Sequence, residues 1–312
     1  MVNQLKTLVG ILFLMILAYA GIWYTAAFQA EKDVTKMLAS WRDQGLLIEH
    51  GKIEHGGFPY RITVDIKNLS IATRAQGLVI TAENIKLISH VWTPGHWLAD
   101  VSVFNVTVAK SNSIIGGTSL IASYRKHDNG KSIVSLESSY STGFHMDRFL
   151  GQPASAPDNW QFFLQFDETN HNSQKGLYAA RFLDFKLEAT SRGNSFSLTA
   201  GLSGPAIKDW SKNQLSNWAN EGGLLDIDSM SFRAGQNYIK GTGSLTLDEH
   251  FKPLGSLSMA TLGGTVISNR LLDLGLQLQS TLPEKNSFSL TLQNGSIQIE
   301  EQPLLTLKKL IY

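Results

Sequence analysis

The feature that most constrains this chain is a run near the N-terminus, Leu8–Phe28, that contains no charged residue. As a helix rising ~1.5 Å per residue, this run is about 30 Å long, which is the thickness of the hydrocarbon core of a membrane. Lys6 precedes the run, and positive residues tend to stay in the cytoplasm, so the rest of the chain is expected on the other side. Trp23 and Tyr24 suit the far membrane interface. We therefore predict a membrane anchor in residues 1–28.

A cleaved signal peptide is the alternative interpretation of the same run. Ala18-Tyr19-Ala20 has the small-x-small pattern that precedes a cleavage site. The apolar run continues to Phe28 instead of ending at Ala20, which favours an anchor that stays attached. Both interpretations export the remainder of the chain.

Residues 29–45 have the pattern of an amphipathic helix that continues from the anchor. Its apolar residues recur at i, i+3, i+4 and i+7, and charged residues occupy the other positions: Val34, Met37, Leu38 and Trp41. Gly45 is a suitable residue for its C-terminal end. This stalk helix either lies on lipid or packs on the first sheet, and packing is the favoured interpretation.

From Leu46 onward the sequence is typical of short β-strands. Ile62, Val64 and Ile66 alternate with polar residues, which is the pattern of a strand with one buried face. The alternation then shifts by one residue near Asn68, and similar shifts occur within 78–88 and 101–108. Each shift requires a bulge or a turn, features that bend strands. The expected fold class is mainly β with a few helices (α+β), built as curved and mostly antiparallel sheet.

The segment Gly151–Asn159 contains two prolines and no periodic pattern, so we expect a linker there. It separates a first β unit, 46–150, from a second β unit, 158–312, and a single continuous domain is the alternative. Within the second unit, helices are predicted over Pro205–Asn220 and Pro303–Ile311. A strand is predicted over Leu274–Gln279, while Val266–Leu272 fits either a helix or a strand.

No catalytic, metal or cofactor signature is present in the sequence. The net charge of +1 and the scattered basic residues argue against nucleic-acid binding. The chain has no cysteine, no Gly-x-Ser-x-Gly motif and no Walker motif. His90 and His96 flank Trp92 and Trp97 around Pro94-Gly95, which is the pattern of a ligand clamp, of an interfacial aromatic patch, or of a loop whose rings pack on the sheet edge. The packed loop is the favoured interpretation. We therefore expect no enzyme activity and no cofactor.

Several short motifs occur in a characteristic order after the anchor. They are Gly57-Phe58-Pro59-Tyr60-Arg61, Gly241-Thr242-Gly243-Ser244-Leu245-Thr246-Leu247-Asp248, Pro253-Leu254-Gly255, and Leu292-Gln293-Asn294-Gly295-Ser296-Ile297 with Pro303-Leu304. This order resembles an uncharacterised family of Gram-negative envelope proteins that is distantly similar to the AsmA-like superfamily. The resemblance implies a single-pass inner-membrane protein with its bulk in the periplasm, and a curved sheet whose apolar face serves lipid or outer-membrane homeostasis. This chain is much shorter than the long lipid-bridging members, so a complete conduit between membranes is not implied.

The leading functional hypothesis is a groove that binds a lipid or acyl chain on the apolar face of the strands. The candidate groove residues are Ile62, Val64, Ile66, Phe162, Leu164 and Phe166. The motif from Gly57 to Arg61 is expected to join the anchor to the sheet, with Phe58 and Tyr60 fixing that junction. The alternative is an envelope scaffold with a closed core that binds protein partners and no ligand.

Overall fold

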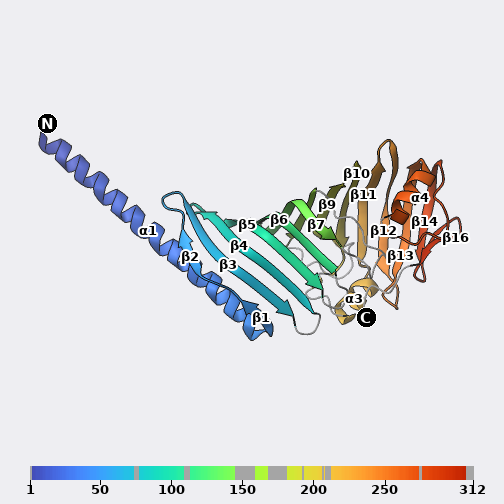
Figure 1. The fold of residues 1–312 in the computed structure, drawn as a ribbon, viewed down its shortest axis with the longest axis horizontal. Helices are drawn as coiled ribbons and strands as arrows, with labels where there is room; N and C mark the ends of the chain where they lie inside the picture. Colours follow the sequence, from blue (N-terminus) through green and yellow to red (C-terminus); the bar gives the residue numbers. More distant parts are fainter. Residues whose placement is uncertain are drawn as a thin grey trace. The chain divides into compact units, whose positions relative to one another are not determined.

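The structure is a computed structural model that describes residues 2–73, 77–108, 113–144, 159–167, 181–191, 193–205, 207, 212–273 and 276–306 (Figure 1). Its helices in these ranges are α1 (Val2–Asp43), α3 (Lys212–Asn220) and α4 (Gly264–Asp273). The strands are β1 (Leu46–Glu49), β2 (Ile53–Gly56), β3 (Arg61–Thr73), β4 (Leu78–His90), β5 (Thr93–Val108), β6 (Ser113–Lys126), β7 (Lys131–Phe144), β8 (Asn159–Asp167), β9 (Arg181–Ser191), β10 (Asn194–Ser203), β11 (Leu224–Ala234), β12 (Asn237–Leu247), β13 (Pro253–Leu262), β14 (Lys285–Gln293), β15 (Ser296–Ile299) and β16 (Gln302–Thr306).

These strands form one large antiparallel sheet that is not closed. β1 and β2 both pair with β3, each along a different stretch of that strand. From β3 to β16 each strand neighbours the next one in the chain. The predicted fold class, mainly β with an N-terminal apolar helix, is confirmed. The chain divides into two compact units, residues 1–110 with 116–124, and residues 111–115 with 125–312. The predicted linker lies almost wholly in residues 151–158, outside the described ranges.

In the first unit, the segments predicted as anchor and stalk form one continuous helix of 42 residues. No proline interrupts the sequence, and Gly45, with φ of +93°, follows the helix end and can adopt the left-handed conformation that terminates helices. The apolar stripe of the stalk packs on the sheet, where Val34 and Leu38 form a cluster with Val64 and Ile66 of β3. The favoured interpretation, a helix packed on the first sheet, is confirmed.

The predicted shifts of alternation occur side by side on three neighbouring strands. The β3–β4 pairing skips Asn68 and Glu83 together, between Lys67↔Asn84 and Leu69↔Ala82, and the β4–β5 pairing skips Glu83 and Val103 at the same level. Each strand skips one residue, so the register is the same on both sides and neither strand has the extra residue that defines a bulge. Asn68 has φ of 49°. The local change of backbone conformation keeps the apolar residues of each strand on one face past this level, since the change of alternation would otherwise turn them to the polar face.

Val103 lies at this level of β5, with φ of 42°, and its side chain is partly exposed. A β-branched residue is unfavourable in the left-handed region, whereas asparagine adopts it more readily. Val103→Asn is therefore expected to raise the free energy of unfolding of the first unit by ~1 kcal/mol. Amide hydrogen exchange of β4 and β5 peptides measures this change. Val101→Asn, at a buried position of the same strand, is the control and is expected to lower protection; a loss of protection in both variants would contradict the prediction.

In the second unit, one face of the sheet is apolar from β7 to β16. The register places Leu136, Phe162, Leu187, Leu198 and Met230 in one row across five strands. α4 covers this face farther along, where Ile267 is buried among side chains of β11 to β14. At one end of the strands, Trp218 of α3 is buried against Leu183 and Leu202. The core of the unit therefore lies between the sheet and these two helices.

The structure decides three predictions of secondary structure near the end of the sequence. Residues Pro303–Thr306 belong to strand β16, so the predicted helix over Pro303–Ile311 is wrong there, and residues 307–312 lie outside the described ranges. These strand residues pair with β15, which compensates for the helical pattern of the sequence. The ambiguous segment Val266–Leu272 is helical within α4. Residues 276–279 are not in a strand, contrary to the strand predicted over Leu274–Gln279.

Candidate functional site

The Gly57–Arg61 motif holds α1 against the start of β3. The Trp23 Nε1–H donates a hydrogen bond to the Arg61 carbonyl oxygen at 2.8 Å, and the Tyr19 hydroxyl donates to the Pro59 carbonyl oxygen. The Phe58 ring meets the Trp23 ring edge to face, with centroids 5.2 Å apart. The predicted junction therefore exists, and Phe58 is part of it. The Tyr60 side chain instead is exposed.

The first three candidate groove residues, Ile62, Val64 and Ile66, share one face of β3 and are all buried. Val64 and Ile66 lie beneath the stalk part of α1, and Ile62 packs with Trp23 and Ala27 of the same helix. Alternation alone could show that these residues face a core, but only the tertiary structure shows that α1 covers them. They contribute to the packing of the first unit and are not accessible to a ligand.

The other three candidates, Phe162, Leu164 and Phe166, share one face of β8. In the register, Phe162 lies between Leu136 of β7 and Leu187 of β9, and Leu164 lies between Val134 and Phe185. We call the incompletely buried apolar side chains on this part of the sheet the β7–β9 apolar face: Val134, Leu136, Trp160, Phe162, Leu164, Phe166, Phe185 and Leu187. Leu183, which lies opposite Phe166 on the same face, is buried against Trp218 and is not included. Sequence alternation identified the β8 members, and the register adds the members from β7 and β9.

Burial along this continuous face changes from one part to the next. Met259, Phe288 and Leu290, which cluster with Ile267 of α4, are buried, and each has less than a tenth of its surface exposed. On the β7–β9 apolar face, all eight side chains are at most partly buried, and Phe166 is 40% exposed. The described helices α3 and α4 contact β11 and β12, and Trp218 of α3 shares a cluster with Leu183 of β9 and Leu164 of β8 at one end of the strands. This region therefore offers apolar surface that these helices leave incompletely covered.

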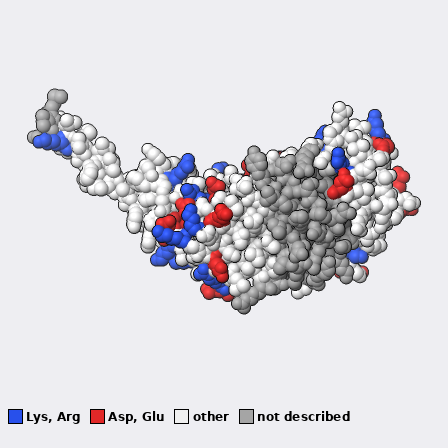
Figure 2. All heavy atoms as spheres, viewed as in Figure 1, with Lys and Arg blue, Asp and Glu red and all other residues white. Residues whose placement is uncertain are grey.

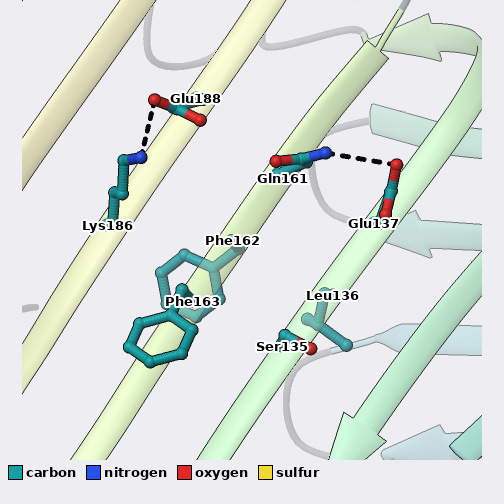
Figure 3. Close-up of a pocket in the computed structure, with 8 residues that line it drawn as sticks. All are labelled: Ser135, Leu136, Glu137, Gln161, Phe162, Phe163, Lys186 and Glu188. Carbon is teal, nitrogen blue, oxygen red and sulfur yellow. Dashed lines mark hydrogen bonds and ion pairs between the residues drawn. The ribbon is translucent and has the colours of Figure 1, made fainter.

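The opposite face of the same three strands is polar and carries a shallow cavity of about 270 Å³ (Figure 3). Its lining comes from Ser135, Glu137, Gln161, Phe163, Lys186 and Glu188, with Leu136 and Phe162 between them. The Gln161 amide donates to a Glu137 carboxylate oxygen at 3.2 Å, and Lys186 Nζ lies 2.8 Å from Glu188 Oε1. These polar groups thus contact one another, Gln161 and Glu137 across β8 and β7 and Lys186 and Glu188 along β9, an arrangement typical of a solvated sheet surface.

The strongest electrostatic feature of the second unit joins β9 to β11. Arg181 donates hydrogen bonds to both carboxylate oxygens of Asp228, at 2.7 and 2.6 Å. These bonds stabilise the charged carboxylate and hold the pKa of Asp228 below its usual range. Nearby, Asp226 accepts hydrogen bonds from the Ser203 and Ser244 hydroxyls. The carboxylates are thus bound by cationic or hydroxyl donors, and the cluster acts as a tie between strands.

The two histidines of the predicted loop contact different partners. His90 stacks on Trp92, with ring centroids 5.2 Å apart and planes inclined by 19°. His96 Nε2 lies 3.2 Å from the Ser123 hydroxyl. Within the described ranges, no three histidine or acidic residues gather closely enough to hold a metal ion. The predicted loop is wrong for most of its length, because β4 ends at His90 and β5 begins at Thr93, so only Val91 and Trp92 form the turn. Trp92 stacks on His90 but is 62% exposed.

The geometry thus defines a β-sheet protein with one N-terminal helix that is long and apolar enough to span a membrane. The chain belongs to a family described as uncharacterized proteins conserved in bacteria (DUF2125), whose model matches residues 23–297. The matched residues begin at Trp23, within α1, and include the junction and nearly the whole sheet. No curated protein and no solved structure matches the chain.

Proposed function

We propose that this protein is a membrane-anchored, non-enzymatic protein of the bacterial envelope, with its sheet in the periplasm, that binds an acyl chain or lipid on the β7–β9 apolar face. The observation that supports the proposal is the change of burial along one continuous apolar face. Side chains of the same kind are enclosed beneath α4 but only partly buried on β7 to β9. An extended apolar surface that remains accessible marks a binding site.

The dimensions of this surface suit a hydrocarbon chain. From Trp160 to Phe166 the stripe along β8 is about 20 Å long at ~3.3 Å per residue. That exceeds the ~15 Å that one leaflet of the hydrocarbon core gives to an acyl chain. Each methylene moved out of water contributes about 0.8 kcal/mol, so a chain lying along the stripe gains enough to bind without polar contacts.

The experiment is photo-crosslinking of the full chain in phospholipid nanodiscs with a photoactivatable fatty acid. Crosslinked peptides are identified by mass spectrometry, which separates labelling of β7, β8 and β9 from labelling of α1 by the surrounding lipid. We expect labelled peptides from β7 to β9. Phe162→Asp should lower that labelling at least tenfold, because a carboxylate on the apolar face disfavours burial of a hydrocarbon chain.

Phe163→Asp is the matched control, because Phe163 is the next residue of the same strand and lies on the polar face. It should change labelling of β7 to β9 less than twofold. Equal losses in the two variants, or labelling confined to α1 in the unaltered protein, would contradict acyl-chain binding. The second outcome would favour the alternative, a scaffold that binds envelope proteins.

A further inference from the structure

The part of α1 that lies clear of the sheet is too short to span a membrane alone. Side chains from Gln4 to Ala18 are exposed or nearly so, and contact with the sheet begins at Tyr19, which bonds to Pro59. Leu5–Ala18 is about 21 Å long at ~1.5 Å per residue. The hydrocarbon core is ~30 Å thick. A helix that spans it must therefore use residues beyond Tyr19, at the level where α1 already touches the sheet.

The sheet at this level ends in two loops that expose large aromatic side chains. The first lies between β2 and β3, where Phe58 and Tyr60 are 53% and 67% exposed, and the second is the β4–β5 turn, where Trp92 is 62% exposed. Arg61↔His90 pairing and the contact of His90 Nδ1 with the Tyr60 carbonyl oxygen at 3.3 Å place the loops side by side. Both lie where α1 leaves the sheet (Figure 1).

The composition of these loops matches a membrane interface. Gly56–Arg61 and His90–Trp97 contain no acidic residue, and the exposed side chain at the base of the first loop is Arg61. Tyrosine and tryptophan are enriched at the level of lipid headgroups, and an arginine there meets phosphate. Figure 2 shows α1 free of charged residues between its tip and the sheet, so the apolar surface of the helix continues up to these loops.

We propose that the Phe58–Tyr60 loop and the Val91–Trp92 turn enter the interface of the bilayer that α1 spans, forming a second contact between this protein and lipid. The occupant of the surface is the glycerophospholipid interface, with the aromatic rings among the upper acyl groups and Arg61 at the headgroup phosphates. Packing of Phe58 on Trp23, and of Trp92 on His90, holds the rings in place without lipid. This proposal rests on the membrane anchor and is independent of acyl-chain binding on β7 to β9.

The experiment uses the absence of cysteine from the chain, which allows single spin labels to be attached to introduced cysteines. The variants are Tyr60→Cys, Trp92→Cys, Phe13→Cys in the free part of α1, and Leu47→Cys. Leu47 is the matched control, since it is an exposed apolar residue on β1. Each labelled full chain is placed in phosphatidylethanolamine–phosphatidylglycerol vesicles, and collision with oxygen is compared with collision with a water-soluble nickel chelate.

We expect labels at 60 and 92 to be at least fivefold less accessible to nickel than the label at 47, and to lie shallower than the label at 13. If the labels at 60 and 92 match that at 47 while the label at 13 lies in lipid, the anchor stands and the second contact is refuted. If the label at 13 is also in water, the anchor itself fails. Neither result bears on crosslinking of β7 to β9, so the two proposals are tested separately.

Discussion

Val64→Asp is expected to unfold the first unit. Val64 is fully buried, and its neighbours are the apolar side chains of α1 and β1: Val34, Leu38 and Ile48. A carboxylate at this position would lose its hydration without gaining a partner, and the displaced packing of α1 adds to the loss. Together these effects should lower the free energy of unfolding of the unit by more than about 4 kcal/mol.

Hydrogen exchange with mass spectrometry on the full chain in detergent micelles measures this effect for each unit separately. Peptides of β3 and β4 should lose protection, whereas peptides of β13 and β14 should retain it. Thr63→Asp is the control, because Thr63 is the neighbouring residue on the other face, where Asp65 already lies 3.6 Å from Lys86 Nζ. Protected β3 peptides in Val64→Asp would show that α1 does not pack on this face.

The second large effect is expected from Gly243→Val in the second unit. Gly243 lies opposite Leu257 in the β12–β13 register. A Cβ added at Gly243 would overlap the Ser256 carbonyl oxygen and lie 2.8 Å from the Leu257 Cα. Both groups belong to the backbone of the neighbouring strand, so rotation of a side chain cannot relieve the overlap. We expect a loss of about 3 kcal/mol in the stability of the unit.

Thr242→Val is the matched control for this change, since it introduces the same side chain at the preceding, exposed position. It should alter stability by less than about 0.5 kcal/mol. Urea unfolding followed by exchange of β12 to β14 peptides gives both values. A Gly243→Val protein as stable as the control would mean that the two strands can separate without cost. The result would also test why glycine occurs twice in Gly241-Thr242-Gly243, where Gly241 lies similarly opposite Met259.

The strand pattern of the first unit could be predicted from sequence because it depends on local alternation. Ile62, Val64 and Ile66 were expected on one face, and a bulge or turn was expected near Asn68. The structure has a left-handed residue at Asn68 and an unchanged register, so the change of alternation is confirmed and a bulge is not. The end of the chain shows the limit of such reasoning. Pro303–Thr306 has apolar residues at helical spacing, yet it pairs with β15, because hydrogen bonds to an existing strand outweigh a weak local preference.

In the candidate site, too, local alternation predicted which residues share a face but not whether that face is covered. Alternation in the sequence identified two triplets of apolar residues, one on β3 and one on β8, as equally suited to a groove. The structure separates them, since α1 buries Ile62, Val64 and Ile66, while Phe166 remains 40% exposed. Which of the two apolar faces is covered depends on where a helix distant in sequence packs. The alternation of apolar residues within one strand carries no information about that helix.

By itself, the sequence determined the apolar helix, the β architecture and the positions where the alternation changes, because each follows from the period of apolar residues along a short stretch of chain. The sequence also indicated that the Gly57–Arg61 motif joins α1 to the sheet, but only the tertiary structure identified Trp23 as its partner on α1 and placed Tyr60 and Trp92 at one exposed end of the first unit. These features join residues that are 30 or more positions apart. Their proximity depends on strand register and helix packing, which are set by the folded chain as a whole.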